Sequence, residues 1–189
     1  MKLAELKECI DRSIEDCQRI INTHPLAVLS EADFERLLSS QISIQIDEDI
    51  NQIPNSDDFS VHNQISHYFE KDGKARIDSR VDVLILKEKE LKENGINHKE
   101  FRYDKDSFVL ELKYLHNNDS VQKVECDFCK WTYLKKESWM YIVVLIDSFN
   151  DEDFKEKETK IMEMREKALN ENIETDSNNL FCAVIRKKI

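Results

Sequence analysis

Residues 108–146 read FVLELKYLHNNDSVQKVECDFCKWTYLKKESWMYIVVLI, and this stretch decides the fold. Its two ends, residues 108–115 and 140–146, are nearly continuous apolar runs of strand length, typical of strands covered on both faces of a sheet. Between them, Asp119 or Ser120 caps a predicted helix whose apolar residues recur at three- and four-residue steps. A strand, a helix and a strand in this order predict two parallel strands joined by a crossover helix.

The rest of the chain adds elements on both sides of this unit. A period of two begins at Ser60 and predicts an outer strand, and the dense apolar run of residues 81–86 predicts a strand inside the sheet. Ser30, followed by Glu31 and Asp33, is typical of a helix N-cap with acidic residues in the first turn. The predicted elements, in chain order, are a helix over residues 2–21, a helix opened by Ser30, strands over 60–69, 77–87 and 108–115, a helix capped at 119 or 120, a strand over 140–146, a helix over 152–170 and a strand over 180–185.

Length and composition favour an α/β fold in a single domain over residues 1–189, with polar connections over residues 47–58 and 88–106. No stretch approaches the roughly 18 apolar residues that span a bilayer, and residues 1–20 carry charges throughout, so neither a membrane partner nor a signal peptide is expected. An odd number of cysteines, five, predicts reduced thiols in the cytoplasm. Cys126 and Cys129 have the spacing of half a zinc site, but no second pair completes it, and buried helical thiols are expected instead.

The formal net charge of −11 argues against a nucleic-acid partner, because phosphate binding draws on Lys and Arg. The acidity is uneven, however. Residues 1–60 contain 5 Lys or Arg and 13 Asp or Glu, which leaves 23 and 26 for residues 61–189. A site that holds a divalent cation is itself acidic, so the overall charge does not exclude a nuclease. With two glycines in the chain, glycine-rich phosphate loops are excluded.

Three charged residues interrupt two otherwise apolar strands: Asp82 in RVDVLIL, and Glu111 and Lys113 in FVLELKYL. Interior charges are unfavourable unless they are paired or bound to a metal. Glu111 and Lys113 share a face of their strand, and Asp82 converges with them if its strand is adjacent with matching orientation. The two carboxylates and a backbone carbonyl such as that of Leu112 are ligands suited to a hard cation. The Lys113 amine can orient or deprotonate a water molecule and offset negative charge, which is typical of phosphodiester hydrolysis.

This arrangement resembles the PD-(D/E)xK nuclease superfamily, with its restriction endonuclease-like αβββαβ core. The resemblance covers residues 30–147, makes the first helix and the last helix and strand additions, and has Val81 where the motif has proline. It implies a metal-dependent nuclease that uses Mg²⁺ or Mn²⁺ and acts on DNA in preference to RNA, with Asp82, Glu111 and Lys113 catalytic. It also implies a further metal-ligating glutamate, Glu31 or Glu35, with Glu31 preferred. A homodimer is compatible with it, since one such site cuts one strand.

Several alternatives stay open on the sequence alone. Asp82 can be a strand-start residue, with Glu111 and Lys113 on a solvated edge face. Asp127 and Lys130 can contribute to the site, although an exposed pair one helical turn apart is the commoner arrangement. Histidines are expected to be structural, and both tryptophans to lie in the core. Rival functions are a catalytically inactive binding or scaffold module with this fold, and an unrelated α/β domain that binds a protein through its charged terminal helices.

Overall fold

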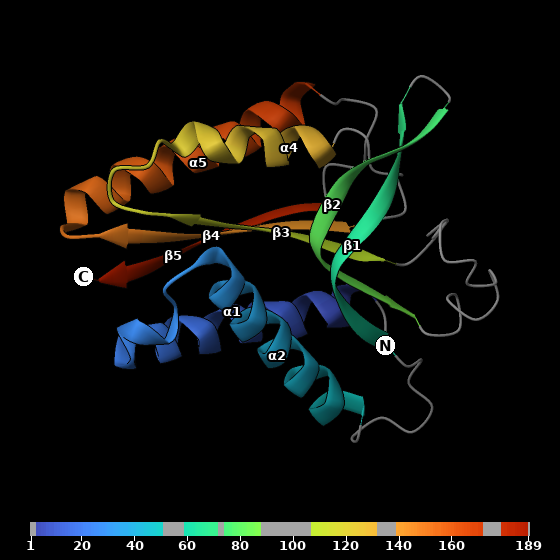
Figure 1. Cartoon of the computed structure of the whole chain (residues 1–189), viewed down its shortest axis with the longest axis horizontal. Helices are drawn as coiled ribbons and strands as arrows, with labels where there is room; N and C mark the ends of the chain where they lie inside the picture. Colours follow the sequence, from blue (N-terminus) through green and yellow to red (C-terminus); the bar gives the residue numbers. More distant parts are fainter. Residues whose placement is uncertain are drawn as a thin grey trace.

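A five-stranded mixed sheet forms the middle of the structure, a computed structural model that describes residues 3–50, 59–71, 74–87, 107–131, 139–171 and 179–188 (Figure 1). β1, β2 and β3 pair antiparallel, whereas β4 pairs parallel to β3, and β5 parallel to β4. The predicted α/β class and the predicted order of helices and strands are confirmed. The strands lie side by side in chain order: β1 (Phe59–Lys71), β2 (Lys74–Lys87), β3 (Phe108–Leu115), β4 (Trp139–Ser148) and β5 (Leu180–Lys188).

β4 is an interior strand of the sheet, as its apolar sequence predicts. It lies between β3 and β5, and all of its residues from Met140 to Ser148 are buried. Its side chains alternate between two hydrophobic cores, one on each face of the sheet. Val143 and Leu145 belong to one core, and Ile142 and Val144 belong to the other. A strand that is buried on both faces needs a continuous apolar run, which is what residues 140–146 supply.

Helices cover both faces of the sheet (Figure 1). α1 (Leu3–Thr23) and α2 (Glu31–Ile50) lie on one face, and α4 (Glu125–Trp131) and α5 (Asp151–Glu171) lie on the other. Within the described ranges, none of the helices combines the length and apolar character that a membrane crossing requires.

The start of α2 is fixed by the predicted cap. Ser30 Oγ accepts a hydrogen bond from the backbone N–H of Asp33 at 3.2 Å, and the Asp33 carboxylate accepts one from the N–H of Leu29, also at 3.2 Å. These reciprocal bonds satisfy amides that have no partner inside the helix. Phe34 is fully buried against the sheet one turn later, so the first turn of α2, with Glu31 and Glu35, is held close to β3.

Several predicted boundaries differ from the structure. β2 begins at Lys74 instead of residue 77, β4 extends to Ser148 instead of residue 146, and β5 extends to Lys188 instead of residue 185. Residues 47–50 are helical rather than part of a loop, because α2 continues its buried stripe of Phe34, Leu38, Ile42 and Ile46 to Ile50. The crossover helix begins with a short 3-10 segment, η2 (Val121–Val124), whose N-cap is Ser120. The other residues of the predicted loops, 51–58 and 88–106, lie outside the described residues, as do the turn at 72–73 and the predicted helix end at Leu134.

Phe34 should carry much of the stability that holds α2 in place. Phe34→Ala is expected to lower the free energy of unfolding by about 3–5 kcal/mol, because it removes a fully buried ring and leaves a cavity. Phe149→Ala is the matched control, since its ring is 64% exposed, and its expected change is within about 0.5 kcal/mol. Urea titrations followed by circular dichroism measure both, and equal losses for the two variants would contradict the role given to Phe34.

Candidate active site

The pairing of β2 with β3 ends just before Asp82. In the described strands it consists of Val83 with Leu110, Leu84 with Val109, and Ile85 with Phe108. Asp82 instead contacts the backbone of Leu112 on β3 and the side-chain amide of Gln64 on β1. The side of residues 111–115 that β2 leaves unpaired is called the open edge of β3 below.

Two carboxylates take the place of β2 along the open edge. The backbone N–H of Leu112 donates to Asp82 Oδ2 at 2.7 Å, and the N–H of Tyr114 donates to Glu31 Oε2 at 3.1 Å. Within a strand, the carbonyl of a residue points to the same edge as its N–H. The Leu112 carbonyl therefore also belongs to the open edge, beside the carboxylates of Asp82 and Glu31.

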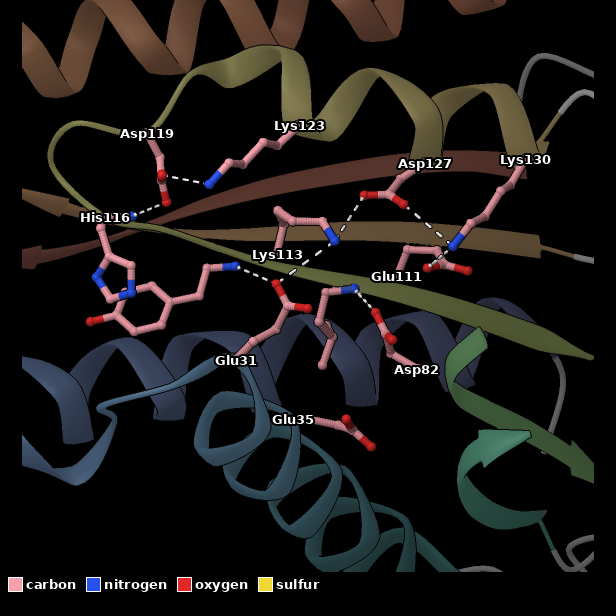
Figure 2. A network of polar contacts seen from close by, with 12 residues as sticks. Glu31, Glu35, Asp82, Glu111, Lys113, His116, Asp119, Lys123, Asp127 and Lys130 are labelled. Carbon is pink, nitrogen blue, oxygen red and sulfur yellow. Dashed lines mark hydrogen bonds and ion pairs between the residues drawn. The ribbon is translucent and has the colours of Figure 1, made fainter. Parts of the chain in front are cut away.

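Lys113 connects the two helical layers across this edge (Figure 2). Its Nζ lies 3.7 Å from Glu31 Oε2 and 3.7 Å from Asp127 Oδ2. The side chain is half-buried, whereas that of Asp127 is almost completely buried. The ammonium thus sits between a carboxylate from α2 and one from α4.

Glu111 is paired with a second lysine from α4. Lys130 Nζ donates to Glu111 Oε2 at 2.5 Å and lies 3.4 Å from Asp127 Oδ1 (Figure 2). Glu111 is only 2% exposed. Its Oε1 and the Oδ2 of Asp127 are buried and accept no hydrogen bond from the described residues. Two buried carboxylates therefore each keep one oxygen that can accept a further donor or a cation.

Glu35 and Asp82 share a contact with Gln64 on β1. The Gln64 amide donates to Glu35 Oε2 at 2.6 Å and to Asp82 Oδ1 at 3.4 Å. Gln64 has φ of 55°, in the left-handed region that residues other than glycine seldom adopt. Backbone strain of this kind tends to concentrate at functional sites. In this protein the residue with the strained backbone is Gln64, whose side-chain amide contacts both Glu35 and Asp82.

Burial sets the electrostatics of the carboxylates. It raises the pKa of Glu111 from 4.5 to about 8, against the attraction of Lys130, with Asp82 and Asp127 adding to the rise. Burial likewise raises the pKa of Asp127, although Lys113 and Lys130 oppose it, and that of Glu35. Burial would lower the pKa of Lys130, but the nearby carboxylates, Glu111 first, outweigh it and raise that pKa.

The sequence-predicted residues gather along one short piece of β3. Asp82, Glu31 and the Leu112 backbone lie on the open edge, Lys113 contacts Glu31, and Glu111 contacts Lys130 of α4. The alternative of a solvated edge face is wrong, because Glu111 is buried and β3 is the middle strand of the sheet.

The exposed pair expected on the crossover helix is also wrong. Asp127 is buried and Lys130 is half-buried, because α4 packs over β3 and turns this pair toward Glu111. Sequence reasoning noted both residues but had no means of orienting the helix. Their i, i+3 spacing beside the buried Phe128 and Trp131 was the available signal.

A second polar cluster supports the site from the far end of β3. Lys187 Nζ on β5 donates to the Tyr114 hydroxyl at 2.6 Å and to the carbonyl of Val28 at 2.7 Å. The Tyr114 hydroxyl donates to Asp147 Oδ1 at 2.8 Å, and His116 Nδ1 lies 3.1 Å from Asp147 Oδ2. Lys187 therefore ties the segment before α2 to the sheet, which helps to position Glu31.

Other sequence expectations have mixed outcomes. Trp131 is a core residue, as predicted, and its indole N–H donates to Asn179 Oδ1 at 3.0 Å. Trp139 is only partly buried and packs edge-on against Phe108. Cys126 and Cys129 are exposed on α4 rather than buried, because that helix directs its other side at the sheet.

The donor set suits a hard divalent cation. The five carboxylates named above, of Glu31, Glu35, Asp82, Glu111 and Asp127, exceed the two ammonium groups of Lys113 and Lys130 by three formal charges. Carboxylate and carbonyl oxygens are the ligands that Mg²⁺ prefers, and Glu111 retains a buried oxygen without a hydrogen bond. Among the described residues, no three His, Cys, Asp or Glu side chains already form a group able to hold a metal ion. Asp82 binds a backbone amide instead, and Glu111 binds Lys130.

The fold and the site together define an α/β protein with a partly buried acidic site that contains two lysines. No family model, no curated protein and no solved structure matches this chain. The assignment of a function therefore depends on the residues of the site and their geometry.

The raised pKa of Glu111 predicts a pH dependence of stability. Between an ordinary value of 4.5 and about 8, the folded protein keeps a proton on Glu111 that the unfolded chain has lost. The folded state then binds more protons, so this group lowers the free energy of unfolding as pH rises through this window. Glu111→Gln removes this titration. The free energy of unfolding of the wild-type protein should therefore fall relative to that of the variant between roughly pH 5 and pH 8.

Urea titrations in EDTA at several pH values measure the difference. Glu156→Gln, which changes an exposed carboxylate on α5, is the control and should follow the wild-type profile. Parallel profiles for the wild-type protein and Glu111→Gln would show that Glu111 does not titrate in this way.

Proposed function

We propose that this chain is a metal-dependent nuclease of the PD-(D/E)xK type that hydrolyses phosphodiester bonds in DNA, with RNA the second choice. The observation that carries the proposal is that Asp82 binds the backbone of Leu112, the residue between Glu111 and Lys113 on a buried strand, and is close enough to Glu111 to influence its carboxylate electrostatically. Glu111 is buried, and Asp82 and Lys113 are partly buried. Burial of charged groups is unfavourable unless they do something that apolar residues cannot. Phosphodiester hydrolysis uses this combination, with acids to hold a cation and an amine to offset developing charge.

The topology around the site supports the same proposal. From α2 to β4, the chain runs through a helix, three antiparallel strands, a crossover helix and a strand parallel to the third. This order agrees with the αβββαβ core of restriction endonuclease-like proteins. α1, α5 and β5 would then be additions to that core.

The oxygen ligands for Mg²⁺ or Mn²⁺ would come from the open edge. Asp82, Glu111 and the Leu112 carbonyl are the main candidates, and Glu31 is the further carboxylate that already lies on this edge. Glu35 is the alternative to Glu31, supported by the Gln64 amide that it shares with Asp82. A bound cation would lower the pKa of a water molecule and polarise the phosphate.

Lys113 has two roles in this proposal. It would orient or deprotonate the attacking water, and it would offset the negative charge on the phosphate. Its ammonium is partly exposed, so a water molecule or a phosphate oxygen can reach it. Glu31 and Asp127, on opposite sides of Nζ, limit its movement and keep it directed along the open edge. A fixed donor of this kind stabilises charge that develops in the transition state, because little reorganisation is needed.

The β1–β2 ribbon supports duplex DNA as the substrate. These strands pair as far as Lys71 and Lys74, well beyond the last residue that β2 shares with β3. The ribbon sequence on that side of Asp82 includes Arg76 and Arg80. A two-stranded ribbon fits the major groove of B-form DNA, whereas the major groove of A-form RNA is too narrow. Cutting both strands takes two sites, which a homodimer would supply.

An open hollow of about 440 Å³ lies between α2 and β1. Its lining is mostly polar and offers hydroxyl, amide and guanidinium groups, all of which bind phosphate oxygens in protein–DNA contacts. It therefore supports a polar, anionic ligand on these two elements. The lining residues are Arg36, Ser39, Ser40, Ser43, Val61, His62 and Asn63.

Cleavage assays test the catalytic assignment. Plasmid, single-stranded DNA and RNA are incubated with the protein in Mg²⁺, Mn²⁺ or EDTA, and metal-dependent cleavage is expected for duplex DNA. Lys113→Ala should reduce the rate by about 100-fold or more, since it removes a positioned proton-transfer and charge-stabilising group. Lys123→Ala is the matched control. This exposed lysine pairs with Asp119 (Figure 2), so the variant is expected to keep full activity.

The inactive binding module gives a different result in the same assay. Nucleic-acid binding without cleavage under any metal condition would favour that module and refute the nuclease. Cleavage that survives in Lys113→Ala would refute the role given to this residue.

Thermal unfolding tests the cation ligands without catalysis. Mn²⁺ that binds only the folded protein raises the apparent Tm, corresponding to about 2.7 kcal/mol at 100 times Kd. Asp82→Asn and Glu111→Gln should lose this rise, whereas Glu156→Gln should keep it because its carboxylate is exposed on α5 and pairs with Lys160. An unchanged rise in Asp82→Asn would assign the Mn²⁺ effect to another site.

A further inference from the structure

The ammonium of Lys130 occupies a position on the Glu111 carboxylate that a bound metal cation could take. Nζ lies 2.5 Å from Glu111 Oε2, and Glu111 is 2% exposed. A carboxylate this deeply buried needs a positive partner when it is ionised. In the substrate-free protein Lys130 provides this positive charge. Glu111 is also a candidate ligand for a divalent cation, so the two cations would compete for it.

We propose that Lys130 is an internal counter-ion that occupies Glu111 until a divalent cation displaces it, and that Asp127 receives the displaced ammonium. The inference rests on the cation-binding part of the proposed function. It gives α4 a role in controlling how tightly the site holds its metal.

Asp127 is placed to receive the ammonium. Its Oδ1 already lies 3.4 Å from Lys130 Nζ, and the two residues are one helical turn apart on α4. Nζ can therefore move from Glu111 to Asp127 by side-chain rotation, while α4 stays in place. The Lys130 side chain is 26% exposed, so the movement does not require the core to open.

The two buried oxygens without hydrogen bonds fit this exchange. Glu111 Oε1 is available to a cation, and Asp127 Oδ2, which is 3.7 Å from Lys113, is available for a closer contact with an ammonium. An ammonium has three N–H donors, so Lys130 can bind Asp127 and water together once it leaves Glu111. An ammonium and a divalent cation repel each other at one carboxylate, so the binding of either one weakens the binding of the other.

Mn²⁺ titration of the substrate-free protein by calorimetry tests the proposal. Lys130→Met removes the competitor and should bind Mn²⁺ about tenfold more tightly, whereas Lys130→Arg keeps a positive group and should stay near the wild-type affinity. Lys123→Met, at an exposed lysine of the preceding 3-10 segment, is the control and should bind as the wild-type protein does. Binding that is lost in Glu111→Gln identifies the relevant site.

A second measurement needs no substitution of Lys130. In protein with ¹⁵N-labelled lysine, the Nζ resonance of Lys130 should shift when Mg²⁺ saturates the wild-type protein, and should not shift in Glu111→Gln. This keeps the test available if Lys130→Met does not fold. An Nζ resonance whose chemical shift does not change at saturating Mg²⁺ would overturn the proposed displacement of Lys130 from Glu111.

The outcomes separate this inference from the nuclease proposal. Unchanged or weaker Mn²⁺ binding by Lys130→Met, with binding still dependent on Glu111, overturns the counter-ion role and leaves the nuclease standing. Tighter binding by Lys130→Met in a protein that cleaves no nucleic acid supports the counter-ion role and refutes the nuclease. Absence of Glu111-dependent binding in both proteins overturns both.

Discussion

The separation of β2 from β3 after Val83 and Leu110 is the constraint on which the site depends. A buried strand that loses its neighbour leaves backbone amides without partners, which is unfavourable in a core. In this protein the amides of Leu112 and Tyr114 bind carboxylates instead of a strand. Sheet geometry thereby draws acids from β2 and α2 to one edge, and the same acids become available for chemistry.

Charge balance follows from this arrangement. Acids concentrated around a buried strand repel one another, so their burial requires cations. Lys113 and Lys130 supply two, and both also contact Asp127, which links the β3 side of the site to α4. The raised pKa of Glu111, caused mainly by burial, shows that this compensation is incomplete. A site in this condition favours a further positive charge.

The helices have a direct part in the geometry because they are anchored from several directions. α2 is capped at Ser30, buried through Phe34 and held at its approach by the contact of Lys187 with the Val28 carbonyl. α4 is placed over β3 by Phe128 and the buried Trp131. Residues from four elements therefore meet at the site without a loop having to position them, which favours a rigid arrangement.

Local sequence was sufficient for the order of elements, for the β3 and β4 strands and for the candidates Asp82, Glu111 and Lys113, because apolar runs and the charges that interrupt them are visible in a few consecutive residues. It was not sufficient for Asp127 and Lys130, whose spacing suits an exposed pair equally well. Only the packing of α4 on β3 turned them toward Glu111. The tertiary structure likewise decided that Glu31 binds the Tyr114 amide, a contact across 83 residues of sequence that no local pattern encodes. The physical reason is that hydrophobic periodicity reports which side of an element is buried, whereas the contacts of a polar side chain depend on which other elements lie beside it.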